Sequence, residues 1–315
     1  MSAYLPRAGD ALLAALAVLS AILALALLVT HIPRSRSART AAWALVVLAV
    51  GAAHGVTSTQ PAGLRMLVVI AALLFAMKAV VSVEARARDG TRLPLRRWLA
   101  FATLWPGMRA ALFAHLRPGR PGAARLLWTG LVHTALGASL FVLARLTWQV
   151  TASAALSSLL LLPALSLLLH FGAFDLVAGL WRRAGADVPP LFRAPLRSTS
   201  LGEFWSRRWN LAFSEMTSLV VYRPLAESAG RRTALVSAFL FSGLLHEAAI
   251  SLPVRAGFGG PLLYFAIHGV LTQIERERGP FGRAGTVLAL LLPLPLLFHV
   301  PFLRGVIWPL LGAPR

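Results

Sequence analysis

The sequence has 315 residues, of which 57% are hydrophobic and only 13% are charged. Soluble domains carry about 25% charged residues, so the composition excludes an ordinary soluble protein and predicts an all-α polytopic membrane protein. The formal net charge is +20, but the arginines lie mainly in short segments between apolar runs. That distribution is typical of loops beside a bilayer and argues against nucleic acid as a partner.

Apolar runs long enough to cross a bilayer, which takes about 20 residues, predict about eight transmembrane helices. The first run is followed by arginines and not by a small-residue cleavage site, so we expect a span and not a signal peptide. The predicted spans are 11–30, 41–57, 64–83, 126–147, 152–181, 233–253, 258–274 and 284–311.

Two further apolar stretches are predicted to be re-entrant or interfacial. Residues 98–115 contain Trp105, Pro106 and Gly107 and are flanked by arginines. A broken helix is tolerated at membrane depth only where protein or water covers its backbone. Residues 211–222 number about 12, which is too few to span.

The basic residues alternate between the two sides of the predicted helices. Arginines are abundant in 34–39, 86–97, 182–208 and 276–283, whereas 57–63 carries no charge. The positive-inside rule therefore predicts an external N-terminus and cytoplasmic basic loops, in a multi-pass protein of the inner or plasma membrane of a bacterium. No internal repeat of the kind found in many transporters is evident, which disfavours a transporter without excluding one.

The segment Ser200–Asn210, SLGEFWSRRWN, gathers aromatic and ionisable residues at the predicted cytoplasmic face. One interpretation is a membrane anchor, because indole and guanidinium groups both favour the headgroup region. The other is a site for the phosphate groups of a cofactor such as coenzyme A. The amide of Asn210 is suited to orienting a substrate or donating to a developing oxyanion. The anchor and cofactor interpretations both concern Trp205, Arg207, Arg208 and Trp209.

His246 lies within a long apolar run, ALVSAFLFSGLLHEAAISL, roughly in the middle of a predicted span. An ionisable residue at membrane depth is a functional candidate by default, and a neutral imidazole can accept a proton. The alternative is a structural hydrogen bond between helices. Glu247 and the polar segment before its helix set His246 apart from the other histidines in or near spans, which are His54, His133, His170, His268 and His299.

Other chemistries at this position have weaker support. The run His246–Ile250, HEAAI, lacks the second histidine of a zinc-protease helix, so no metal site is predicted. Ser242 lies one helical turn before His246 and is a conceivable nucleophile, but the strained elbow that such serines occupy is missing. The sequence has no cysteine, which excludes disulfides, thiolate metal sites and an acyl-cysteine intermediate.

These motifs resemble those of the membrane-bound O-acyltransferases, in the subgroup of the plant wax synthases. The FW–RRWN block followed by a membrane-embedded histidine 36 residues after its asparagine is a specific combination, and two of the other motifs support it. The similar motifs are LWPGM (Leu104–Met108), PLFRAPLRSTSLGEFWSRRWN (Pro190–Asn210), YRPL (Tyr222–Leu225), SGLLHE (Ser242–Glu247) and FAIHG (Phe265–Gly269).

The resemblance implies an enzyme that transfers a fatty acyl group from acyl-CoA to a long-chain alcohol or another lipid hydroxyl, with acyl-CoA as co-substrate and no resident cofactor. His246 matches the family's catalytic histidine and is expected to act as general base, without an acyl-enzyme. Asn210 matches the family's second catalytic position. Substrate or acyl-CoA binding is expected of Glu203, Trp205, Arg207, Arg208, Trp209, Arg223, Glu247 and His268.

One integral membrane domain is expected, with N-terminal transmembrane helices in 1–97, an O-acyltransferase-like catalytic core in 98–283 and a C-terminal transmembrane segment in 284–315. Its expected partners are acyl-CoA, the acceptor and the lipid bilayer. The acceptor stays open, since a sterol, a diacylglycerol, a polysaccharide or a secondary-metabolite hydroxyl would suit the same fold. An alternative of another class is a transporter or a non-catalytic lipid-binding membrane protein.

Overall fold

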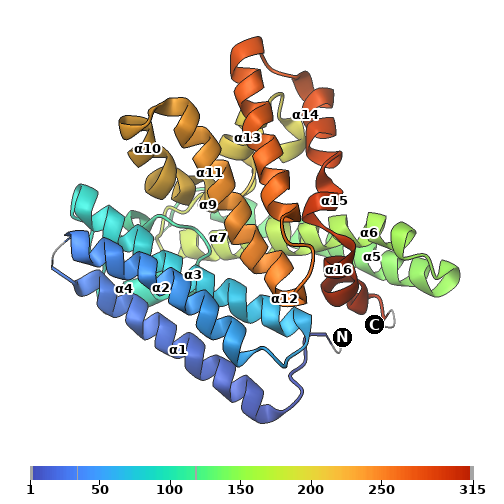
Figure 1. The fold of residues 1–315 in the computed structure, drawn as a ribbon, viewed down its shortest axis with the longest axis horizontal. Helices are drawn as coiled ribbons and strands as arrows, with labels where there is room; N and C mark the ends of the chain where they lie inside the picture. The colour runs from blue at the N-terminus through green and yellow to red at the C-terminus, as the bar shows by residue number, and fades with distance from the viewer. Residues whose placement is uncertain (1–2, 34, 118, 313–315) are drawn as a thin grey trace.

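The computed structural model describes residues 3–33, 35–117 and 119–312, and within those ranges the chain forms helices, turns and loops but no strand (Figure 1). The all-α fold is therefore as predicted. Within the described ranges, six helical stretches are long and apolar enough to cross a membrane: Gly9–His31, Ser35–Val56, Ala62–Asp89, Ala123–Thr151, Ala154–Arg183 and Gly230–Val254.

The prediction of a polytopic membrane protein is confirmed, but the predicted count of about eight spans is not. A seventh span results if Gly282–Leu297 and Val300–Leu310, which meet at an angle of 69°, are counted as one. Prolines interrupt this last run, because proline cannot continue the helical hydrogen-bond ladder. The predicted span 258–274 forms α13 (Gly260–Arg278), whose final turn Glu275–Arg278 is fully charged. Its apolar part is thus too short to cross a bilayer.

The first three helices, α1 (Gly9–His31), α2 (Ser35–Val56) and α3 (Ala62–Asp89), lie side by side, and each packs against the other two (Figure 1). Small side chains allow membrane helices to approach closely and pack by dispersion. Alanines accordingly fill the contact between them, and those almost completely buried include Ala26, Ala42, Ala53, Ala72 and Ala76.

Residues 98–115 do not form a spanning helix, in agreement with the predicted re-entrant or interfacial segment. Lys78 of α3, which is completely buried, donates to the carbonyl oxygens of Phe101, Trp105 and Gly107 at 2.8, 2.7 and 2.6 Å. These carbonyls belong to the region where the helix stops, and an unpaired carbonyl in the membrane is costly. The stretch consists of α4 (Leu95–Thr103), an irregular segment and the 3₁₀ turn η1 (Ala110–Phe113).

The long helix α5 (Ala123–Thr151) forms an antiparallel hairpin with a continuous helical run that follows it. A glycine allows the close approach: a Cβ on Gly130 would lie 3.0 Å from the carbonyl oxygen of Gly172 and 2.9 Å from the side chain of Leu176. The second arm consists of α6 (Ala154–Ser166), the π-helical segment η2 (Leu167–Ala173) and α7 (Phe174–Arg183).

The helices that position the candidate site follow in the chain, and α11 and α13 run next to each other (Figure 1). The stretch 211–222, too short to span, is helical and consists of α9 and η5, after which α10 begins. The elements are η3 (Pro195–Arg197), α8 (Leu201–Glu203), η4 (Phe204–Arg208), α9 (Leu211–Thr217), η5 (Ser218–Tyr222), α10 (Arg223–Ser228), α11 (Gly230–His246), η6 (Glu247–Ser251), α12 (Leu252–Val254), α13, α14 (Gly282–Leu291), α15 (Leu294–Leu297), α16 (Val300–Phe302), η7 (Leu303–Ile307) and η8 (Trp308–Leu310).

Candidate active site

His246 is the last residue of the 17-residue helix α11, inside the 25-residue apolar stretch Gly230–Val254. At 1.5 Å rise per residue it lies about 24 Å from the start of that stretch and about 12 Å from its end. The histidine is therefore deep within the span, somewhat beyond its middle.

One nitrogen of the His246 ring is bound to the backbone. Nδ1 lies 2.7 Å from the carbonyl oxygen of Ser242, one turn earlier. Since a carbonyl oxygen can only accept, the neutral ring carries its hydrogen on Nδ1 and its lone pair on Nε2. The residue is half-buried, and its Nε2 has no hydrogen-bond partner among the described residues. The backbone thus holds the ring in the tautomer that a general base needs.

Two phenylalanines from different helices face the His246 ring. The ring of Phe265, from α13, has its centroid 4.3 Å from that of the imidazole, and the ring of Phe213, from α9, lies at 5.4 Å. These apolar walls fix the ring plane and keep water from its faces.

Asn210 caps the helix that carries Phe213. Its backbone is left-handed, with φ 44° and ψ 63°, a conformation that asparagine adopts more readily than most residues. Its Oδ1 accepts the backbone N–H of Phe213 at 3.3 Å, which orients the amide and leaves Nδ2 free to donate. Because Phe213 also contacts the His246 ring, one helical turn connects the two predicted catalytic residues.

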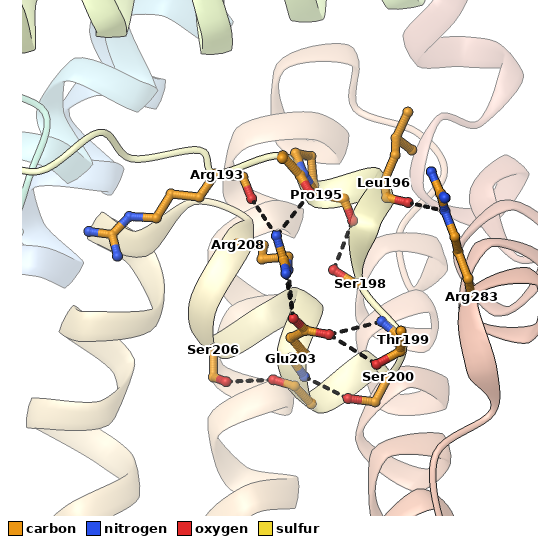
Figure 2. Close-up of polar contacts among 12 residues, drawn as sticks. Arg193, Pro195, Leu196, Ser198, Thr199, Ser200, Glu203, Ser206, Arg208 and Arg283 are labelled. Atoms are coloured by element: carbon orange, nitrogen blue, oxygen red, sulfur yellow. Dashed lines mark hydrogen bonds and ion pairs between the residues drawn. The ribbon is translucent and has the colours of Figure 1, made fainter. Parts of the chain in front are cut away.

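The polar segment before Asn210 is held together by its own side chains (Figure 2). Ser200 accepts the backbone N–H of Glu203 at 3.0 Å, and the Glu203 carboxylate accepts the backbone N–H of Thr199 at 2.9 Å. Arg208 completes the network, donating to Glu203 at 2.7 Å and to the carbonyl oxygens of Arg193 and Ala194. The hydrogen bond from the Thr199 N–H and, to a smaller extent, that from Arg208 hold the pKa of the Glu203 carboxyl below its usual value. Glu203 and Arg208 therefore shape this loop.

Two of the predicted binding arginines differ from Arg208 in being free. Arg207 and Arg223 are both exposed, and neither forms an ion pair or hydrogen bond with a described residue. Arg207 lies on the π-helical segment η4 and Arg223 begins α10. Their guanidinium groups are available to an anion from outside the chain.

A second polar cluster lies on the other side of Phe265. The Trp205 ring lies 5.5 Å from that of Phe265 and 5.4 Å from that of His268, a completely buried residue. His268 repeats the arrangement of His246, with Nδ1 2.7 Å from the carbonyl oxygen of Tyr264. The Trp205 Nε1, the His268 Nε2 and the hydroxyl of Thr272 are buried without a partner in the described chain. Buried polar atoms are normally paired, so this cluster suits a water or a ligand hydroxyl.

Trp209 faces a different group of rings. Its ring lies 4.9 Å from Phe192 and 5.5 Å from His170, and it stacks at 14° on Phe204 at 5.5 Å. The tryptophan thus packs the polar segment onto η2, where it serves the wall of the site.

Two carboxylates attach α13 to the site, and only Glu247 was predicted from the sequence. Its Oε1 accepts the backbone N–H groups of Gly259 and Leu262 at 2.8 and 3.1 Å, so it caps the start of α13. Glu275 accepts the N–H groups of Leu201 at 2.7 Å and Gly202 at 3.3 Å. In the described part of the chain, no three His, Asp or Glu side chains gather into a metal site.

Glu275 was missed because nothing in TQIERER distinguishes it from its charged neighbours. The capping pair Ser200 and Glu203, by contrast, has the S-x-x-E spacing of a capping box and could have been found.

Two of the π-helical segments of the described chain lie at these residues. A π-helical segment contains Trp205, Arg207 and Arg208, and another begins directly after His246. A π turn widens the helix by one residue and leaves carbonyl groups displaced from the regular ladder, which is why such segments occur frequently at functional sites.

Comparison with known proteins now places this geometry in a class. Residues 188–267, which include both Asn210 and His246, match the membrane bound O-acyl transferase family. The match confirms the resemblance seen in the sequence for that segment. It lies inside the predicted core 98–283, whose boundaries stay a prediction.

Curated proteins similar to part of this chain are named long-chain-alcohol O-fatty-acyltransferases. The enzyme of that name from Simmondsia chinensis is 36% identical over 100 residues, which is 29% of this chain and 28% of that protein. The probable long-chain-alcohol O-fatty-acyltransferase 7 of Arabidopsis thaliana is 35% identical over 110 residues, 31% of this chain and 32% of that protein. The probable enzyme 6 of the same plant is 38% identical over 69 residues, 20% of each chain. The similarity therefore spans less than a third of each relative.

Proposed function

We propose that this protein is an acyl-CoA-dependent O-acyltransferase, which transfers a fatty acyl group to the hydroxyl of a long-chain alcohol. The observation that carries the proposal is the His246 ring, locked by Ser242 with Nε2 open, within the segment that resembles the long-chain-alcohol acyltransferases. The mechanism uses His246 as general base and Asn210 as its polar partner.

The reaction would proceed by direct transfer. The acceptor hydroxyl gives its proton to Nε2 of His246 while its oxygen attacks the thioester carbonyl carbon. The tetrahedral intermediate then collapses, the carbon–sulfur bond breaks, and the leaving sulfur takes the proton back from the imidazolium. The products are an ester and free CoA, and His246 returns to its neutral form. The phenylalanine walls exclude water, which would otherwise hydrolyse the thioester.

Asn210 is suited to the oxyanion that forms in this step. Its Oδ1 is held by the Phe213 N–H, so Nδ2 points its hydrogens elsewhere. A donor placed in advance for developing negative charge is worth about 10²–10³ in rate. We assign it that role or the closely related one of orienting the thioester carbonyl.

For the donor, the free guanidinium groups of Arg207 and Arg223 would bind phosphate groups of acyl-CoA. Arg208 and Glu203 would contribute indirectly by holding the loop, and Trp209 and Glu247 by packing and capping. Trp205 and His268, whose Nε1 and Nε2 are buried without partners, would act indirectly, by holding a buried water at the wall of the site. Acyl-CoA is thus proposed as a co-substrate with no resident cofactor.

The membrane location follows from the helices, whereas the orientation is part of the proposal. We place the N-terminus outside and the arginine-rich loops in the cytoplasm, where acyl-CoA is available. The relatives named above are plant proteins, and a bacterial membrane stays an expectation from the sequence.

One assay tests the proposal against its alternatives. The purified protein is given radiolabelled acyl-CoA with a long-chain alcohol, a sterol or a diacylglycerol, and ester and free CoA are measured together. We expect equal release of CoA and ester, fastest with the long-chain alcohol. If the enzyme is fastest with the sterol or the diacylglycerol, the proposed acceptor is wrong but the proposed acyl transfer stands. Intact thioester with every acceptor, despite acyl-CoA binding, would contradict an acyltransferase and favour a carrier or lipid-binding protein.

A further inference from the structure

Beyond His246 in the chain, at α12, a cavity of about 380 Å³ is lined by arginines. Ligand cavities commonly measure about 300–1,000 Å³. Arg7, Arg65 and Arg304 come from three distant parts of the chain: the segment before α1, the start of α3, and η7. No described residue that lines the cavity is acidic. We call it the arginine cavity; Ala3, Gln60, Pro61, Ala62, Pro253, Val254, Pro301 and Gly305 complete its lining.

Arg65 gives the strongest indication of a missing ligand. Its side chain is 5% exposed, yet it forms no ion pair with any described residue. One nitrogen, Nη2, donates to the carbonyl oxygen of Leu252 at 3.1 Å and lies 3.4 Å from Nδ1 of His54. Its Nε is buried without a partner. A buried guanidinium without a counter-charge is costly, and an anion in the cavity would remove that cost.

The two other arginines are held ready at the rim. Arg7 and Arg304 are exposed, and neither side chain has a partner in the described chain. The position of Arg7 is fixed by its backbone N–H, which donates to Oε1 of Gln60 at 3.0 Å. Three like charges facing one cavity repel each other unless an anion lies between them.

A second cavity, of about 260 Å³, is apolar and has no lining residue in common with the first. Consecutive or nearly consecutive residues line the two cavities on three chain segments, for example Arg65 and Met66. Tyr4 of the second cavity follows Ala3 of the first, with its ring against Gly63 and its hydroxyl donating to the carbonyl oxygen of Val306 at 2.9 Å. We call it the apolar cavity; its lining is Tyr4, Met66, Leu67, Leu165, Leu169, Ile307 and Leu310.

We propose that these adjoining cavities form a binding site for an anionic lipid, with the headgroup in the arginine cavity and an acyl chain in the apolar cavity. An anion alone would leave the apolar cavity unexplained, and a neutral lipid would leave Arg65 without a counter-charge. The shared chemistry is an anionic group, phosphate or carboxylate, joined to a long hydrocarbon chain. The site is independent of the proposed acyl transfer.

The test measures lipid binding by native mass spectrometry on the full chain purified in detergent. The probe is dioleoyl phosphatidylglycerol, with dioleoyl phosphatidylcholine, oleate and inorganic phosphate as competitors. We expect phosphatidylglycerol to bind and phosphatidylcholine not to compete. Competition by oleate would extend the site to fatty-acid carboxylates. Displacement by millimolar inorganic phosphate as effectively as by oleate would show a free-anion site and overturn the assignment to a lipid.

Matched variants locate the site. The double variant Arg7→Gln/Arg304→Gln should weaken phosphatidylglycerol binding by about tenfold or more, since charge-assisted contacts are lost. Arg92→Gln/Arg96→Gln removes the same charge from two other exposed arginines and should change binding less than about twofold by the same reasoning. Equal losses in the two double variants would overturn the proposal.

The apolar half has its own pair of variants. Leu67→Gln changes a lining residue that is 49% exposed, and Leu131→Gln changes one that is 55% exposed on α5, away from the cavity. Only Leu67→Gln should weaken the binding of dioleoyl phosphatidylglycerol. It should leave the binding of dihexanoyl phosphatidylglycerol, a short-chain analogue used as a further probe, unaffected. If Leu67→Gln has no effect on binding of the dioleoyl lipid, the acyl chain does not lie in the apolar cavity and the proposed site is wrong.

Discussion

Replacing His246 by glutamine gives the most direct test of the proposed base. Glutamine keeps a side chain of similar reach, and its amide can still donate to the Ser242 carbonyl that Nδ1 of His246 contacts at 2.7 Å. It has no useful basicity. General-base catalysis contributes about 10²–10⁴-fold, so acyl transfer should fall by at least about 10². Alanine is less informative, because it also opens a gap between Phe213 and Phe265.

His268→Gln is the matched control. His268 has the same bond from Nδ1, to the carbonyl oxygen of Tyr264 at 2.7 Å, but its Nε2 is completely enclosed. We expect kcat of this variant to stay within about tenfold of wild type, since no base is lost.

The measurement is steady-state release of CoA by purified variants, with acyl-CoA binding followed separately. A His246→Gln variant that keeps more than about a tenth of the wild-type rate would refute the base assignment, because the floor for a lost base is about 10²-fold. A kcat loss in His268→Gln as large as in His246→Gln would equally contradict it.

Three further changes follow from the contacts around the site. Arg207→Ala should weaken acyl-CoA binding about tenfold with the fold intact. Arg208→Ala should instead release the Thr199–Asn210 loop to limited proteolysis, because of the two arginines it is Arg208 that binds Glu203. Identical behaviour of the two variants would contradict the division of roles. The lowered pKa of Glu203 means that its contribution to loop stability is complete above the ordinary value of 4.5 and declines as the pH falls below it. The hydrogen-exchange protection factors of 199–209, which are corrected for the intrinsic effect of pH, should fall there in the wild type and stay constant in Glu203→Gln. Lys78→Met should lower the free energy of unfolding by several kcal/mol, at about 1.5–3 kcal/mol per charged hydrogen bond, and should therefore lower the unfolding temperature. A melting curve unchanged from wild type would refute the anchoring role of Lys78.

Composition and apolar run length were sufficient to predict the fold class and the approximate position of most spans. They overestimated the number of spans for a physical reason. Hydropathy detects the apolar stretch of α13 but gives little weight to the charged turn Glu275–Arg278 that ends it. It likewise cannot detect the 69° bend in the last run, although the prolines there were visible.

The roles of the site residues were harder to predict from the sequence, because neighbouring residues of the same type have different roles. Arg207 and Arg208 are adjacent and chemically identical in the sequence, yet one is exposed and unpartnered while the other holds the loop through Glu203. The direction in which each points depends on the π turn of η4, which moves side chains off the regular helical spacing. No periodicity in a single sequence reports such a turn.

His246 and His268 show what distinguishes a base from a buried binding group when the local chemistry is the same. Both are histidines inside apolar helices, both give Nδ1 to the carbonyl four residues earlier, and both therefore carry the lone pair on Nε2. They differ in access, since His246 is half-buried and His268 is completely buried against Trp205. A proton acceptor must be reached by the hydroxyl that it deprotonates. Access to Nε2, which depends on the packing of α9, α11 and α13 and not on the histidine's neighbours in the sequence, is why the base is assigned to His246.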